Sequence, residues 1–167
     1  METKVISNDV MFAEVKKFIS EGCSVEIRVK GNSMNPFLAS GRDTIVLSPV
    51  IMEDLGPGAF VLGRDSFGRW VAHRIVKVAE DYVILNGDGN FIKATERVEK
   101  SDILAQVTGF VRKGRRCSTD GFSWKAYSAY WKVAGALRIG SWSLRRVHLG
   151  IWRRLNSSYI LKPTANK

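Results

Sequence analysis

Apolar residues near the N-terminus recur at the spacing of an α-helix. Over residues 8–21 they lie three or four positions apart, Asn8 or Asp9 can serve as the N-cap, and Gly22 ends the segment. The next residues, 24–31, alternate between apolar and charged side chains, which is typical of a half-buried strand. The pattern therefore predicts one helix followed by one strand.

Residues 31 to 111 form short apolar runs separated by turn residues. Gly-Pro-Gly at 56–58 and Gly-Asp-Gly-Asn at 87–90 are sequences that favour turns. Several short strands at this spacing predict an antiparallel barrel or a sandwich-like sheet. The candidate strands are 44–48, 59–63, 69–78, 82–86 and 103–111.

After residue 120 the apolar spacing becomes helical again, and Gly140-Ser141 divides this region into two predicted helices. Each helix carries an apolar stripe on one side and polar residues on another. The first stripe consists of Trp124, Tyr127, Trp131 and Ala134, with Lys125, Ser128 and Lys132 opposite, and the second of Leu144, Val147, Ile151 and Leu155. We therefore expect three parts: an N-terminal helix over residues 1–24, a mainly β domain over 25–111, and a helical basic extension over 112–167.

The positive charge is concentrated in the predicted extension. The 167 residues have a net charge of +10, but residues 1–110 contain 13 basic and 15 acidic side chains, a net charge of −2. Residues 111–167 contain 13 basic side chains and one acidic side chain, a net charge of +12. This asymmetry indicates a near-neutral domain followed by a segment that meets a polyanion, either phospholipid or nucleic acid.

The aromatic residues of the extension favour phospholipid. Four of the five tryptophans lie there, and tryptophan and tyrosine are enriched at membrane interfaces. We therefore expect reversible binding of residues 112–167 to an anionic membrane surface. The alternative is that one aromatic face of the extension packs on the β domain.

The composition excludes several kinds of site. Cys23 and Cys117 are far apart and in no CxxC spacing, which excludes a disulfide framework and a cysteine-rich zinc site. Only two histidines, His73 and His148, are present, which argues against a multi-histidine metal centre, and we expect no cofactor. No run reaches the roughly 18 apolar residues of a membrane span, and the N-terminus lacks the apolar stretch of a secretory signal. We therefore expect a cytoplasmic protein, at most peripheral on the inner membrane face.

Two short strings contain candidate catalytic residues. Ser33 lies in a tight turn between a strand and a segment that begins near Pro36. A serine there can expose its hydroxyl while backbone N–H groups point at one spot, as a nucleophile and an oxyanion hole together require. In the second string, His73 lies on an apolar strand and Asp88 in a turn. The plain alternatives are a turn serine, a core histidine and an aspartate that bonds local amides.

The order Gly-x-Ser-Met-x-Pro, Gly-x-Asp, His-Arg-Ile and Gly-Asp-Gly-Asn resembles the signal peptidase I superfamily, which includes the self-cleaving LexA-type repressors. The resemblance covers residues 25 to about 111 and implies a LexA/signal-peptidase-like β fold. It also implies a serine endopeptidase that removes leader or signal sequences from a peptide or protein substrate.

The superfamily uses either a Ser–Lys pair or, in archaeal and endoplasmic-reticulum signal peptidases, a histidine at the lysine position. This sequence is similar to the second kind. The resemblance implies Ser33 as nucleophile, His73 as general base and Asp88 as the acidic partner that orients or stabilises the imidazolium. Since Gly31 stands where many bacterial members have a second serine, the backbone N–H groups of Ser33 and Met34 would form the oxyanion hole.

Other bases and other functions stay open. Lys77 is expected on the same strand face as His73 but four residues further along, and Lys93 follows the Gly-Asp-Gly-Asn turn. A LexA-like regulator could bind nucleic acid through the basic extension, with tryptophans stacked on bases. Only one helix fits before residue 25, where a helix-turn-helix would be needed, so nucleic acid is the weaker partner. A third possibility is a non-catalytic, peptide-binding member of the fold.

Overall fold

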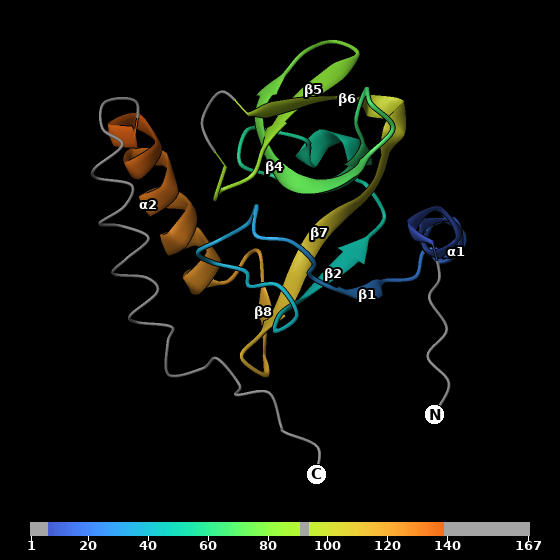
Figure 1. The fold of residues 1–167 in the computed structure, drawn as a ribbon, viewed down its shortest axis with the longest axis horizontal. Helices are drawn as coiled ribbons and strands as arrows, with labels where there is room; N and C mark the ends of the chain where they lie inside the picture. The colour runs from blue at the N-terminus through green and yellow to red at the C-terminus, as the bar shows by residue number, and fades with distance from the viewer. Residues whose placement is uncertain (1–6, 91–93, 139–167) are drawn as a thin grey trace.

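The computed structural model describes residues 7–90 and 94–138. Within these ranges, one eight-stranded antiparallel sheet has the order β1-β2-β7-β3-β4-β5-β6, with β8 paired to β7. The strands are β1 (Val25–Arg28), β2 (Thr44–Ser48), β3 (Phe60–Arg64), β4 (Trp70–Val78), β5 (Tyr82–Asn86), β6 (Thr95–Glu99), β7 (Ile103–Arg112) and β8 (Arg115–Ser118). The helices are α1 (Asn8–Ser20) and α2 (Phe122–Arg138), with short 3-10 turns η1 (Met52–Asp54) and η2 (Lys100–Asp102). The prediction of a mainly β protein with a helix before and after the sheet is confirmed (Figure 1).

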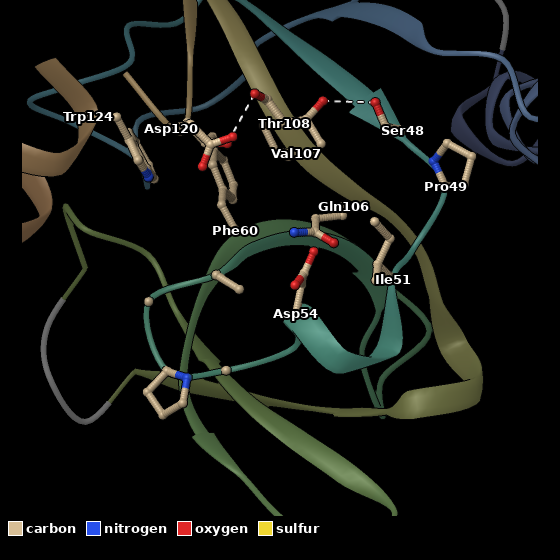
Figure 2. Close-up of a pocket in the computed structure, with 15 residues that line it drawn as sticks. Ser48, Pro49, Ile51, Asp54, Phe60, Gln106, Val107, Thr108, Asp120 and Trp124 are labelled. Carbon is tan, nitrogen blue, oxygen red and sulfur yellow. Dashed lines mark hydrogen bonds between the residues drawn. The ribbon is translucent and has the colours of Figure 1, made fainter. Parts of the chain in front are cut away.

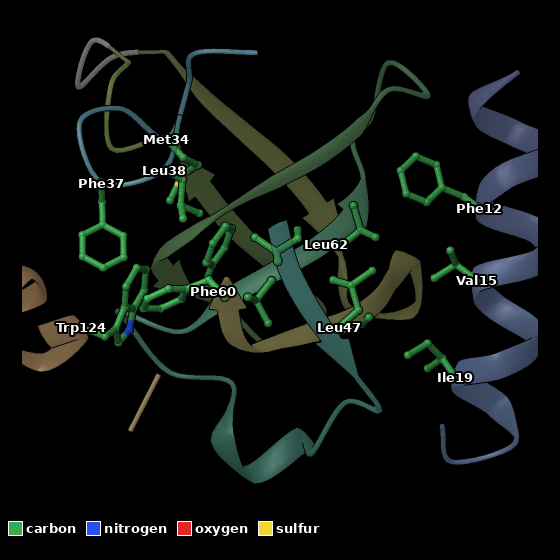
Figure 3. Packing of buried hydrophobic residues seen from close by; sticks show 14 of the residues in the cluster. Phe12, Val15, Ile19, Met34, Phe37, Leu38, Leu47, Phe60, Leu62 and Trp124 are labelled. Atoms are coloured by element: carbon green, nitrogen blue, oxygen red, sulfur yellow. The ribbon is translucent and has the colours of Figure 1, made fainter. Parts of the chain in front are cut away.

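Helix α1 begins and ends close to its predicted limits. Its N-cap is Ser7, one residue before the predicted Asn8 or Asp9, because the Ser7 hydroxyl accepts a hydrogen bond from the N–H of Val10 at 3.4 Å. Gly22 follows the helix with a φ of 81°, a conformation that glycine adopts without strain. Three buried residues on one side of α1 point toward the sheet (Figure 3): Phe12, Val15 and Ile19.

The predicted strands match β2, β3, β4, β5 and β7 to within one residue at each end, but β6 and β8 were missed. Only Val98 is buried in β6, and none of the four residues of β8 is buried. Both strands are polar and lack the alternation that predicts a half-buried strand. β8 follows β7 through the two-residue turn Lys113-Gly114, and both turn residues have positive φ, as a two-residue hairpin turn requires.

The core consists of two clusters on opposite faces of β4. The first cluster lies between the sheet, α1, α2 and the loop that carries Ser33 (Figure 3). The second fills the curled half of the sheet and comprises Leu55, Val61, Ile75, Val83, Leu85 and Val98. Because strand residues alternate between faces, Ala72 packs against the first cluster and Ile75 belongs to the second. His73 therefore lies on the face of the second cluster.

Helix α2 packs into the first cluster. Trp124 and Tyr127 are buried, and the Trp124 ring lies 5.2 Å from the ring of Phe37 and 5.8 Å from that of Phe60, centroid to centroid. This is the packing alternative for the start of the extension, and it leaves these two side chains unavailable to a membrane while α2 is docked. Membrane binding by the rest of the extension stays a prediction.

Several sequence-based predictions fall outside the described residues. They concern the second predicted helix with Trp142 and Trp152, together with Lys93 and His148. Within the part of the chain that the structure describes, no helix is long and apolar enough to cross a membrane.

Candidate active site

Ser33 lies on a loop whose two ends are hydrogen-bonded to each other. The N–H of Val29 donates to the carbonyl of Asp43, and the N–H of Gly41 donates to the carbonyl of Val29, both at 2.9 Å. The buried Asp43 carboxylate also accepts from the N–H of Ala39 at 2.9 Å. Three side chains anchor the loop in the first cluster: Met34, Phe37 and Leu38. Ser33 itself is partly exposed, so an anchored loop holds the serine at the protein surface.

The Gly-Asp-Gly-Asn turn packs directly on this loop. The N–H of Gly89 donates to the carbonyl of Ser33 at 2.7 Å. A Cβ atom at Gly87 would lie 3.0 Å from the Cβ of Ser33 and 2.6 Å from its carbonyl oxygen, and one at Gly89 would lie 2.8 Å from the carbonyl oxygen of Asn32. Both positions therefore require glycine for a reason of close approach. The structure brings together two motifs that are about 55 residues apart in the sequence.

The strand register brings His73 toward the same place. Arg74 of β4 pairs with Asn86 of β5, and continuing this register by one residue places Gly87 opposite His73. Opposite residues of an antiparallel pair carry their side chains on the same face, with Cβ atoms about 5 Å apart. The Ser33 carbonyl, the Ser33 Cβ and the Asn90 side chain occupy the space that a side chain at Gly87 would need. Among the described residues no hydrogen bond joins the Ser33 hydroxyl to the His73 ring.

His73 has a carboxylate partner that the sequence did not indicate. Its Nδ1 lies 3.1 Å from Oε2 of Glu96 on β6, and both side chains are largely buried, with exposed fractions of 6% and 12%. Leu85 of β5 pairs with Ile75 on one side and with Glu96 on the other, which places Glu96 on the face of His73. The sequence pattern could not indicate Glu96, because the strand that carries it, β6, was not predicted.

Asp88 instead pairs with Arg74. The Asp88 carboxylate accepts from Nε and Nη2 of Arg74, both at 2.9 Å, and the two side chains are 0% and 1% exposed. These contacts give Asp88 a partner other than His73. The orienting role that the resemblance assigns to Asp88 stays a prediction.

The Arg74 guanidinium also connects the site to α2. Its Cζ lies 4.4 Å from the ring centroid of Trp124 and 4.9 Å from that of Trp131, within the range of cation–π contacts. Its Nη1 donates to the hydroxyl of Ser128 at 2.9 Å and to the carbonyl of Gly58 at 3.2 Å. Ser128 was predicted on the polar side of this helix, but it lies at the border of the buried face, one residue after Tyr127. The Gly-Asp-Gly-Asn turn and α2 thus hold the same arginine.

The candidate oxyanion donors are available in the described part of the chain. Neither the N–H of Ser33 nor that of Met34 makes a hydrogen bond to another described residue. Lys77 is excluded as a close alternative base, because the register shifts between Ile75 and Lys77 and turns this exposed side chain to the face opposite His73. Lys93 lies outside the described residues.

A separate hollow of about 690 Å³ lies between η1 and the start of α2 (Figure 2). Asp54, Gln106, Asp120 and Trp124 are among the residues that line it, but Ser33 and His73 are not. Within residues 7–90 and 94–138, no group of three histidine, cysteine or acidic side chains could hold a metal ion.

Comparison with known proteins adds no relative: no protein-family model, no curated protein and no solved structure matches this chain.

Proposed function

We propose that this protein is a serine endopeptidase of the signal peptidase type, which removes a leader or signal sequence from a peptide or protein by acyl transfer through Ser33. The contact between the two motif loops carries the proposal. The Ser33 loop and the Gly-Asp-Gly-Asn turn meet at Gly87 and Gly89, beside the strand that bears His73.

The proposed reaction has two steps. The Ser33 Oγ attacks the scissile carbonyl carbon and transfers its proton to Nε2 of His73. The carbonyl oxygen becomes an oxyanion and accepts hydrogen bonds from the N–H groups of Ser33 and Met34. The C–N bond then breaks, the leaving amine takes the proton from His73, and an ester remains on Ser33. In the second step water gives a proton to His73 and attacks the ester carbon. The bond between that carbon and the Ser33 Oγ then breaks, Oγ takes the proton back from His73, and the acid is released.

The substrate would bind as an added strand. β1 is an edge of the described sheet and leads directly into the Ser33 loop. A peptide paired with such an edge gains main-chain hydrogen bonds whatever its sequence, and small pockets select its side chains. This arrangement suits an endopeptidase whose substrates share a cleavage site rather than a long sequence.

The pH dependence of cleavage identifies the base. Only a neutral imidazole can accept the Ser33 proton, so we expect the rate to rise with pH as the base loses its proton and then to level off. In His73→Lys, weak activity should appear only above about pH 9, since free lysine titrates near pH 10. Initial rates on one cleaved peptide across this range provide the test. A wild-type rate that rises only above about pH 9 would assign the base to a lysine such as Lys93.

A further inference from the structure

We propose that Glu96 is the carboxylate that positions His73 for the reaction. This role rests on the proposed function and deepens it. It differs from the family resemblance, which gives the same role to Asp88. The inference starts from the contact between His73 Nδ1 and Glu96 Oε2, which lie 3.1 Å apart.

The sheet fixes the positions of both residues of this contact. His73 comes from β4 and Glu96 from β6, and the intervening β5 fixes the distance between the two strands through its pairing with both. The apolar side chains of the second cluster occupy the same face. Because the contact is largely shielded from water, the attraction between the carboxylate and a charged imidazole is screened less than it would be at the surface.

The contact determines which imidazole nitrogen can act as a base. An ionised carboxylate only accepts hydrogen bonds, so Nδ1 of a neutral His73 must carry the proton when it bonds to Glu96. Nε2 then keeps its lone pair free for the proton of Ser33. After that transfer, the same carboxylate stabilises the imidazolium.

The other basic and acidic side chains near the site support this division. Both oxygens of Asp88 are engaged by Arg74, and turning Asp88 toward His73 would leave a fully buried guanidinium without its counter-charge. The hydrogen bond to Asp65 raises the pKa of Arg69, and the charge of Glu96 adds a smaller effect in the same direction. Glu96 is thus the acid bonded to His73, and Asp88 is the acid bonded to Arg74.

The test reads the His73 tautomer directly by ¹⁵N NMR of the full-length protein at a pH where imidazole is neutral. The sequence has only two histidines, so a His148→Asn background assigns the His73 signals. We expect the Nδ1–H tautomer in the parent. In Glu96→Gln the amide can donate as well as accept, so the Nε2–H tautomer should become populated. Glu99→Gln, on the same strand but with a side chain that is 41% exposed and paired with Arg97, is the matched control and should leave the tautomer unchanged.

The kinetics of peptide cleavage by the same variants provide a second measurement. Glu96→Gln should lower kcat by about 10²-fold with little change in KM, the size expected when a general base is disoriented. Glu96→Asp keeps the charge and should recover part of the rate and the Nδ1–H tautomer. If Glu96→Gln does not fold, the aspartate variant still decides, since an Nε2–H tautomer in a folded Glu96→Asp protein would contradict the proposal.

The two levels of the proposal fail in different ways. An unchanged tautomer and an unchanged kcat in folded Glu96→Gln would overturn the role of Glu96 and leave the Ser33–His73 reaction standing. Cleavage that survives Ser33→Ala would instead overturn the proposed function.

Discussion

Ser33→Ala is expected to reduce peptide cleavage by roughly 10⁵- to 10⁶-fold, the loss seen when a serine nucleophile is removed. The fold should be retained, because Ser33 is partly exposed and its neighbours Met34, Phe37 and Leu38 anchor the loop without it. No core cavity opens when this hydroxyl is lost. The change therefore separates the chemistry at Ser33 from the stability of the loop.

Cleavage can be measured without knowing the natural substrate. Peptides from a digested whole-cell extract are incubated with the protein, and new termini are identified by mass spectrometry. Ser40→Ala is the matched control: Ser40 lies in the same loop and is exposed, and its hydroxyl accepts a hydrogen bond from the N–H of Gly31 at 3.2 Å. We expect this control to cleave within a few-fold of the wild-type rate. A folded Ser33→Ala protein that cleaves like wild type would end the assignment of Ser33 as the nucleophile.

Arg74→Ala is expected to cause the largest loss of stability, about 3–5 kcal/mol in the free energy of unfolding, as for other buried ion pairs that lose one partner. The substitution leaves the buried Asp88 carboxylate without Arg74 and removes the cation–π contacts to Trp124 and Trp131. It also removes the hydrogen bond to Ser128. The start of α2 should loosen together with the Gly-Asp-Gly-Asn turn.

Urea unfolding of Arg74→Ala and Arg97→Ala tests this expectation. Arg97 has the same kinds of partner, because its Nε lies 2.8 Å from the Glu99 carboxylate and its Cζ lies 3.8 Å from the centroid of the Tyr82 ring. Unlike Arg74, its side chain is half exposed. Its loss should cost only about 0–1 kcal/mol. In the double variant Arg74→Ala/Asp88→Ala, part of the lost stability should return, because the lone buried charge is gone. Equal losses for the two arginines would contradict the bracing role of Arg74.

The sequence predicted those elements whose side chains alternate or recur along one face. β2, β4 and α1 are half or fully buried, so their apolar patterns are clear, and each was predicted nearly to its limits. β6 and β8 are mostly polar, and their stability comes from backbone pairing with β5 and β7 rather than from their own side chains. Such strands are determined by pairing with a neighbouring strand, which the apolar pattern of their own residues does not contain.

The same reason explains what was missed at the candidate site. Ser33, His73 and Asp88 stand in short motifs that the sequence displays. Glu96 has no motif, and it reaches His73 only because β5 aligns two strands across the sheet. The docking of α2 was left as one of two alternatives, because an aromatic stripe on a basic helix is the same whether it packs on a sheet or on lipid. In the structure the start of α2 packs on the β domain, and the rings of Trp124 and Trp131 lie against the Arg74 guanidinium.

A double-mutant cycle on peptide cleavage tests most directly whether Ser33 and His73 act as one catalytic unit. The rates of wild type, Ser33→Ala, His73→Ala and the double variant are compared on the fastest-cleaved library peptide, with equal folding of all four checked by urea unfolding. Because a base is useless without its nucleophile, we expect the double variant to be no slower than either single variant. Losses that multiply in the double variant, or cleavage retained when His73 is replaced, would contradict the account.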